Sequence, residues 1–198
     1  MRKEPRGTEQ IEEQRQKRAT ARQSQKRKGL VIVNTGHGKG KTTAAMGLIF
    51  RAWGRGMKVC MIQFLKHEAG GWGEVKAAKK LGIDWIKTGD GFTWTSRDME
   101  ETVARALHGW EVAKEKVVSG QYDLLVLDEF TYLLKFGWLD VAEVIDWIRE
   151  NKPPVLHLVI TGRDAAPELL AFADLVTEMT NIKHPFDQGI KAQAGIEF

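Results

Sequence analysis

The chain lacks several features that define whole classes of protein. Its 198 residues include one cysteine, so no disulfide can form within a chain. Its five histidines do not have the spacing of zinc ligands. No apolar run approaches the ~20 residues of a membrane span, and the first residues lack the apolar region of a secretory signal. These absences favour a cytoplasmic protein that does not act in a membrane and in which Cys60 is a buried thiol.

The positive charge is concentrated at the N-terminus. Residues 1–28 carry ten Lys/Arg and four Asp/Glu, whereas the rest of the chain has a small negative net charge. We therefore expect a basic arm at 1–28 and one domain at 29–198. The arm is either a solvated tail or a segment that folds over an anionic ligand. No aromatic residues are interleaved with its charges to stack on bases, which argues against a nucleic-acid partner.

A glycine-rich stretch at residues 35–43 reads Thr-Gly-His-Gly-Lys-Gly-Lys-Thr-Thr. It follows the apolar run 30–33 and precedes the helical pattern of 44–50. A loop between strand and helix directs backbone N–H groups at a phosphate, and the helix N-terminus adds positive charge. Lys41 can neutralise phosphate oxygens, and Thr42 can offer a hydroxyl to Mg²⁺. The stretch predicts a site for a nucleotide polyphosphate.

The glycine stretch departs from the usual Walker A pattern at its first position. Thr35 stands where that pattern has a glycine, and Gly36 comes one residue late. A shorter loop should hold the phosphates differently. The motif therefore predicts nucleotide binding without predicting ordinary ATP hydrolysis.

Apolar runs alternate with helical patterns along the rest of the chain. Strands are predicted at 58–64, 84–87, 124–127, 155–161 and 175–178, and helices at 73–81, 98–119 and 140–150. This alternation predicts an α/β fold of the P-loop NTPase-like (RecA-like) type, with a mostly parallel sheet and helices on both faces. Ligands of such sheets bind at the C-terminal ends of the strands.

Several charged residues stand at those strand ends. Asp128 and Glu129 follow the apolar run 124–127, as in a Walker B element, and either carboxylate could hold the metal. Arg163 follows another strand and a glycine, which suits contact with phosphate or ribose. Arg51 is near the end of the first helix, where a surface cation is its ordinary role; it is a weaker candidate for nucleotide contact.

A second loop carries two large aromatic residues. Phe92 and Trp94 occur in Gly-Phe-Thr-Trp at residues 91–94. Loops rarely need such side chains for the core, so they either contact a planar or apolar ligand or plug onto the domain.

Taken together, the motifs resemble a known family. The altered glycine loop and the Gly-Phe-Thr-Trp loop occur with Leu-Asp-Glu-Phe-Thr-Tyr at 127–132, Ile-Thr-Gly-Arg at 160–163 and a Lys-His…Phe-Asp-Gln-Gly-Ile-Lys-Ala-Gln-Ala-Gly-Ile-Glu segment at 183–197. In this order they resemble the P-loop type of ATP:corrinoid adenosyltransferase over roughly residues 28–198. The family also has a counterpart of the basic arm.

The resemblance implies an activity. ATP binds with Mg²⁺ (or Mn²⁺), the Co(I) of a corrinoid attacks the ribose C5′, a cobalt–carbon bond forms and triphosphate leaves. The family further implies a flavoprotein reductant, a homodimer, and a role in adenosylcobalamin biosynthesis or corrinoid salvage.

The resemblance also assigns roles to residues. Thr42 and Glu129 are the first choices for the metal, with Asp128 second. Phe92 and Trp94 match the aromatics that displace the lower axial ligand of cobalt, and Lys41 stabilises the leaving triphosphate. His37 stands where the family often has Asn. The nucleotide contacts are Gly36, His37, Gly38, Lys39, Gly40, Lys41, Thr42, Thr43, Arg51 and Arg163.

Three other functions are weighed against this one. A P-loop ATPase or kinase would release phosphate or ADP, but the altered loop and the aromatic loop argue against it. A nucleotide-gated module with a nucleic-acid arm would bind with steep salt dependence, which a negatively charged body does not favour. A corrinoid carrier would not need the triphosphate loop.

Overall fold

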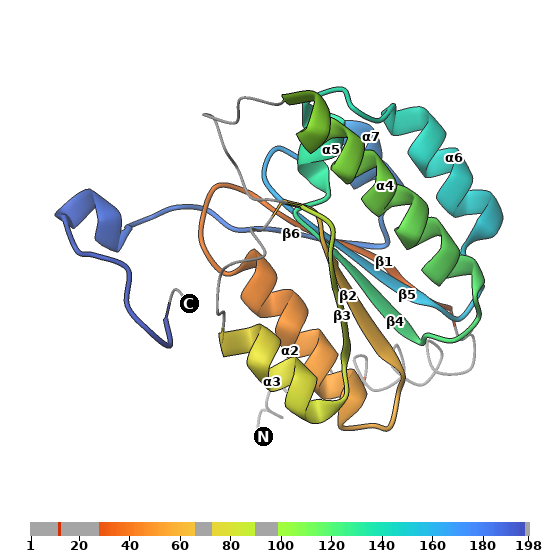
Figure 1. Ribbon diagram of the computed structural model, residues 1–198, viewed down its shortest axis with the longest axis horizontal. Helices are drawn as coiled ribbons and strands as arrows, with labels where there is room; N and C mark the ends of the chain where they lie inside the picture. Colours follow the sequence, from red (N-terminus) through yellow and green to blue (C-terminus); the bar gives the residue numbers. More distant parts are fainter. Residues whose placement is uncertain (1–11, 13–27, 66–72, 90–98, 197–198) are drawn as a thin grey trace, which may run out of the picture.

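The computed structural model describes residue 12 and residues 28–65, 73–89 and 99–196 (Figure 1). Strands and helices alternate along this part of the chain. In chain order they are β1 (Val31–Thr35), α2 (Lys41–Trp53), β2 (Val59–Gln63), α3 (Gly73–Leu81), β3 (Asp84–Lys87), α4 (Met99–Val118), β4 (Leu124–Asp128), α5 (Thr131–Lys135), α6 (Val141–Asn151), β5 (His157–Thr161), α7 (Pro167–Phe172), β6 (Leu175–Glu178) and the 3₁₀ helix η1 (Pro185–Gln188).

The strands form one six-stranded sheet in the order β3-β2-β4-β5-β1-β6. Every pairing in it is parallel, with Val33 opposite Ile160 and Ile62 opposite Leu127. The C-terminal ends of β1, β4 and β5 therefore meet at one edge. This confirms the predicted P-loop-like α/β architecture and brings the three strand-end motifs together.

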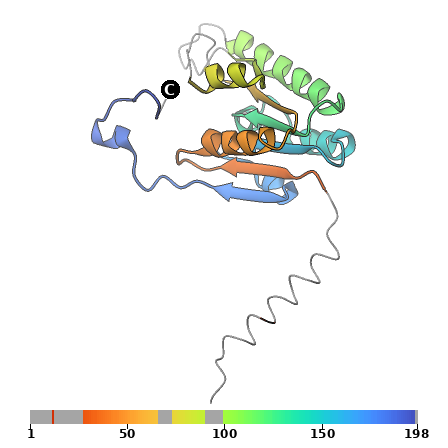
Figure 2. The same cartoon turned by 90° about the horizontal axis from the view of Figure 1, so that it is seen from below.

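Helices cover both faces of the sheet (Figures 1 and 2). Successive residues of a strand point to opposite faces, so the apolar strands supply two separate cores. Ile32 belongs to the core under α2 and α3, whereas its neighbours Val31 and Val33 belong to the core under α4, α6 and α7. The near-continuous apolar strands of the sequence are thus explained by burial on both sides.

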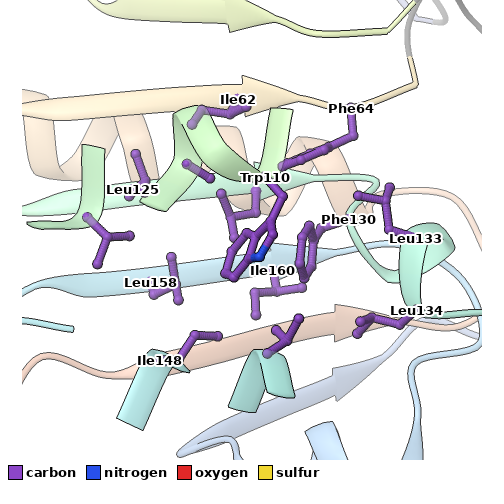
Figure 3. Close-up of a cluster of buried hydrophobic side chains, with 14 of the residues drawn as sticks. Ile62, Phe64, Trp110, Leu125, Phe130, Leu133, Leu134, Ile148, Leu158 and Ile160 are labelled. Carbon is purple, nitrogen blue, oxygen red and sulfur yellow. The ribbon is translucent and has the colours of Figure 1, made fainter. Parts of the chain in front are cut away.

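Aromatic rings fill the larger core near the strand ends (Figure 3). The ring of Phe130 lies 5.1 Å from that of Phe64 and 5.2 Å from that of Trp110. Trp110 also meets Trp147 edge-on at 5.3 Å. These contacts fix α4 and the start of α5 against the sheet, directly behind the residues that follow β4.

The strands and long helices lie where the sequence predicts them, with ends shifted by no more than three residues. The helix predicted at 140–150 begins as expected, since the Asp140 carboxylate accepts a 3.0 Å hydrogen bond from the Glu143 N–H. The helices α5 and α7 were not predicted, because five and six residues are too few to show a helical period. The basic arm, apart from residues 12 and 28, and the Gly-Phe-Thr-Trp loop lie outside the described residues.

Residues 179–180 lie against the glycine loop, and residues 181–196 extend from the body (Figure 1). Ile182 and Phe186 in this segment are 91% and 79% exposed. Among the described residues no helix combines the length and apolar character needed to cross a membrane.

Candidate active site

The glycine loop packs tightly against the chain that follows β6. Gly36 has a φ of 95°, and a Cβ there would lie 2.5 Å from the carbonyl oxygen of Met179. The Gly38 N–H donates a 2.6 Å hydrogen bond to the same carbonyl. β1 itself continues through Thr35, which is buried and accepts a hydrogen bond from the Ala165 N–H. The position where the usual pattern has a glycine is therefore the last residue of a strand in this protein.

Lys41 lies across the loop. Its Nζ donates hydrogen bonds of 2.7 Å to the carbonyl oxygens of both Gly36 and Gly38. Burial and then the positive charge of Arg163 lower the pKa of Lys41. A bound anion would raise the pKa of Lys41 again, because its negative charge stabilises the buried ammonium. The lysine is thus positioned at the N-terminus of α2, where phosphate oxygens are expected.

Asp128 is the centre of a buried hydrogen-bond network. It is fully buried, and its Oδ1 accepts hydrogen bonds from the hydroxyls of Thr42 at 2.9 Å and Thr161 at 2.6 Å. Its Oδ2 accepts from the Gln63 amide at 3.0 Å, and the Gln63 oxygen accepts from the Trp85 indole at 2.8 Å. The network links β1, through the loop and α2, to β3 and to the ends of β2, β4 and β5.

Glu129 has a different position from its neighbour. Its backbone is left-handed, with a φ of 64°, and its N–H donates to the Thr161 hydroxyl at 3.0 Å. Its half-buried side chain lines the cavity, whereas Asp128 lies beneath it. The sequence pattern did not distinguish the two carboxylates, and the structure shows that Glu129 lines the cavity whereas Asp128 is buried in the hydrogen-bond network.

A cavity of about 950 Å³ opens above these residues, large enough for a nucleotide. Its wall combines cationic, acidic and apolar groups. It is lined by Gly38, Lys39, Gly40, Lys41, Thr42, Thr43, Met46, Gly73, Glu74, Ala77, Glu129, Tyr132, Thr161, Gly162, Arg163, His184, Gly195 and Ile196. The cations and the helix N-terminus suit a polyphosphate, while Met46, Tyr132 and Ile196 offer apolar contact.

Seven of the ten predicted nucleotide contacts line this cavity, whereas Gly36, His37 and Arg51 do not. Arg51 is exposed near the other end of α2, about 15 Å along the helix from Lys41, and does not line the cavity. The cavity lining gives Arg51 no support as a nucleotide contact, and that role stays a prediction. Phe92 and Trp94 lie outside the described residues, so their role stays a prediction.

Sequence patterns missed several residues of the site. Gln63 and Thr161 are the last residues of buried strands, and this position at the ligand-binding edge was the available signal. Tyr132 lies in the unpredicted α5. Asp164 follows the predicted Arg163, and its carboxylate reaches His37 of the loop at 2.8 Å.

The donor set fits Mg²⁺. Among the described residues there is no group of three or more His, Cys, Asp or Glu that could hold a metal ion. Mg²⁺ does not need such a cage, because it keeps several waters and binds through one or two protein oxygens plus phosphates. The Thr42 hydroxyl and the Glu129 carboxylate on the cavity wall can supply those oxygens.

A glycine loop with lysine and threonine, followed by an acidic strand end in a parallel sheet, defines a P-loop nucleotide-binding protein. The fold agrees with this class. The flagellar accessory protein FlaH of Methanocaldococcus jannaschii superposes with a TM-score of 0.54 at 10% identity, over 76% of this chain and 70% of that one. At this identity the likeness concerns the fold alone.

Sequence comparison defines the family. The profile described as "ATP:corrinoid adenosyltransferase BtuR/CobO/CobP" matches residues 27–198, and the chain belongs to this family. A corrinoid adenosyltransferase of a Sinorhizobium species is 47% identical over 86% of this chain and 81% of its own length. Those of Pseudomonas aeruginosa and Escherichia coli K12 are 39% and 38% identical, over 89% and 91% of this chain and 87% and 91% of theirs. The protein is an ATP:corrinoid adenosyltransferase, and it adenosylates corrinoids in cobalamin biosynthesis or salvage.

Proposed function

We propose that the cavity holds the triphosphate of ATP in the glycine loop and leaves the ribose C5′ open to a corrinoid. One observation carries this assignment: Lys41 and Arg163 line the same cavity at the N-terminus of α2. Two cations and unpaired helix N–H groups form a strong site for a polyanion. The same groups stabilise triphosphate as it gains negative charge on leaving.

The reaction follows from this placement. The electron pair of substrate Co(I) attacks C5′, the C5′–O bond breaks, and its electron pair leaves with the triphosphate. Cobalt is the nucleophile, so no protein nucleophile or general base is needed. The protein contributes orientation of C5′ and stabilisation of the leaving group.

Mg²⁺ would bind between the protein and the triphosphate. Thr42 and Glu129 would hold it, and Asp128 would orient Thr42 through the 2.9 Å hydrogen bond. When bound, the ion neutralises part of the triphosphate charge. Mn²⁺ can replace it, since both ions prefer oxygen ligands.

We assign contact with the corrinoid to the Gly-Phe-Thr-Trp loop and the basic arm. The resemblance of the sequence to the family supports this assignment. Phe92 and Trp94 displace the lower axial ligand of cobalt, so that a flavoprotein can reduce Co(II) to Co(I) in the reducing cytoplasm. The basic arm closes over the bound corrinoid. Deletion of residues 1–27 should weaken corrinoid binding and leave ATP affinity unchanged; unchanged corrinoid turnover would remove the role of the arm.

We also propose that two copies of the chain pair. In support, β6 is an edge strand whose residues are all exposed, although strands of parallel sheets are usually covered on both faces. Leu175 and Val176 are 48% and 40% exposed, and a two-fold contact would cover both edges at once. Light scattering should give the mass of a dimer for the native chain and of a monomer for Leu175→Glu with Val176→Glu. A monomeric native chain would contradict the pairing.

The proposed chemistry is tested directly by determining which bond of ATP breaks, C5′–O or O–Pα. ATP labelled with ¹⁸O at the oxygen that bridges C5′ and the α-phosphorus is converted with Co(I) corrinoid, and the released triphosphate is analysed by mass spectrometry. Attack at C5′ places the label in the triphosphate. Label retained in the nucleoside product would mean attack at phosphorus and would contradict the proposal.

A further inference from the structure

The loop after β5 is fixed by contacts on both of its sides. The Gly162 N–H donates to the Asn34 carbonyl at 3.2 Å, and the Arg163 carbonyl accepts from the Thr131 hydroxyl at 2.7 Å. Gly162 has a φ of 144°, and a Cβ there would lie 2.0 Å from the Thr131 Oγ1. The backbone on either side of Arg163 is thus held against β1 and α5.

Asp164 adds a second set of links through its side chain. Its Oδ1 lies 2.8 Å from the Nε2 of His37 in the glycine loop, and its Oδ2 accepts a 2.6 Å hydrogen bond from the Nζ of Lys135 in α5. One carboxylate therefore joins three segments that are distant in the sequence. We call His37, Asp164 and Lys135 the clasp. The hydrogen bond from Lys135, and then that from His37, lowers the pKa of Asp164, so the carboxylate is ionised at neutral pH.

Arg163 points into the cavity beside the clasp. Its side chain is exposed and makes no hydrogen bond or ion pair with another residue that the structure describes. Asp164 does not neutralise it, because both carboxylate oxygens already have partners on His37 and Lys135. The guanidinium therefore stays available for an anion, next to Lys41, whose pKa is lowered by burial and by the charge of Arg163.

We propose that Asp164 is a positioning residue for Arg163: the clasp holds the loop after β5 against the glycine loop, so that the guanidinium meets the triphosphate. The proposal rests on the proposed triphosphate site and extends it to His37 and Lys135. Because a long cationic side chain on a free loop would have to be ordered on binding, the clasp raises affinity by ordering it beforehand.

If Asp164 only stabilised the fold, its replacement would lower the melting temperature instead of selectively weakening triphosphate binding. The Asp164 side chain is 34% exposed, and ion pairs of this kind contribute little to folding. Asp164 also has a left-handed backbone, with a φ of 51°, which Asn and Gly adopt readily. Asp164→Gly therefore keeps the backbone and removes the clasp, whereas Asp164→Asn keeps the backbone and removes the negative charge and one of the two acceptor oxygens.

The experiment measures the affinity of inorganic triphosphate and of ATP, each with Mg²⁺, by calorimetry. We expect Asp164→Asn and Asp164→Gly to weaken both ligands about three- to tenfold, as for a mispositioned charge-assisted hydrogen bond, with the melting temperature nearly unchanged. In steady-state assays the KM for ATP should rise by the same factor while the KM for the corrinoid stays constant. His37→Ala should show a smaller loss of the same kind.

Measurements in the Arg163→Ala variant distinguish an action of Asp164 through Arg163 from an independent effect of Asp164 on triphosphate binding. If Asp164 acts through Arg163, adding Asp164→Asn to Arg163→Ala causes no further loss of triphosphate affinity. An undiminished further loss would overturn the positioning role, and so would native affinity in Asp164→Asn or Asp164→Gly. If the native chain itself binds no triphosphate, the proposed site fails and the clasp fails with it.

Discussion

The hydroxyl of Thr42, at the start of α2, donates a 2.9 Å hydrogen bond to Asp128, at the end of β4. The two residues are 86 positions apart in the chain. This bond connects the glycine loop to the acidic strand end. Asp128 also accepts hydrogen bonds from Thr161 and Gln63, so its carboxylate joins three side chains from different elements.

Thr161→Val should destabilise the protein although valine has the same shape. Thr161 donates to Asp128 and accepts from the Glu129 N–H, so valine removes one of the three hydrogen bonds of Asp128 and the partner of the Glu129 N–H. We expect a loss of about 1–3 kcal/mol in the free energy of unfolding, measured by urea denaturation. Thr177→Val, on the exposed strand β6, is the matched control and should change little. Equal effects of the two substitutions would contradict the network.

Lys41→Ala should abolish detectable ATP binding. The lysine lies across the loop, where its Nζ contacts the carbonyl oxygens of Gly36 and Gly38, and it lines the cavity. Titration calorimetry with ATP and Mg²⁺ measures the effect. Lys58→Ala, an exposed lysine before β2, is the control and should bind normally. Native affinity in Lys41→Ala would refute the loop assignment.

Phe92→Ala with Trp94→Ala should impair the reaction selectively. If these rings displace the axial ligand of cobalt, their loss slows turnover from Co(II) with a mild reductant. Turnover from chemically prepared Co(I) should be affected far less, because that ion no longer needs the ligand removed. Rates from both starting states are compared by absorbance. Equal losses in the two assays would leave the rings without this role.

Asp174 should contribute to acid stability. Hydrogen bonds from Lys28 and from the Val31 N–H lower its pKa below the ordinary value of 3.8. A carboxyl with a depressed folded-state pKa stabilises the fold above its unfolded pKa and loses that contribution as the pH falls through the folded value. Chemical denaturation between pH 6 and about pH 2 should therefore show a shallower decline for Asp174→Asn than for the native chain. Parallel declines would contradict this contact.

The sequence predicted the elements that carry long periodic patterns and the motifs whose spacing is local. Strands such as β4 could be predicted from apolar runs, because both faces of the sheet are buried. The order of strand, loop and helix identified the glycine loop. The clasp was not predictable, because His37, Lys135 and Asp164 belong to three separate segments whose proximity depends on the fold. Arg51 shows the converse: a cation close in sequence to the loop lies at the far end of α2.

The products formed from ATP and Co(I) corrinoid test the central claim most directly. The native enzyme is supplied with Mg²⁺, ATP and chemically reduced corrinoid, and both the light-sensitive alkyl-cobalt product and triphosphate are quantified. The account predicts equal amounts of the two products, and neither with Lys41→Ala. Phosphate and ADP without alkylation of cobalt would contradict it, because the cavity would then serve phosphoryl transfer.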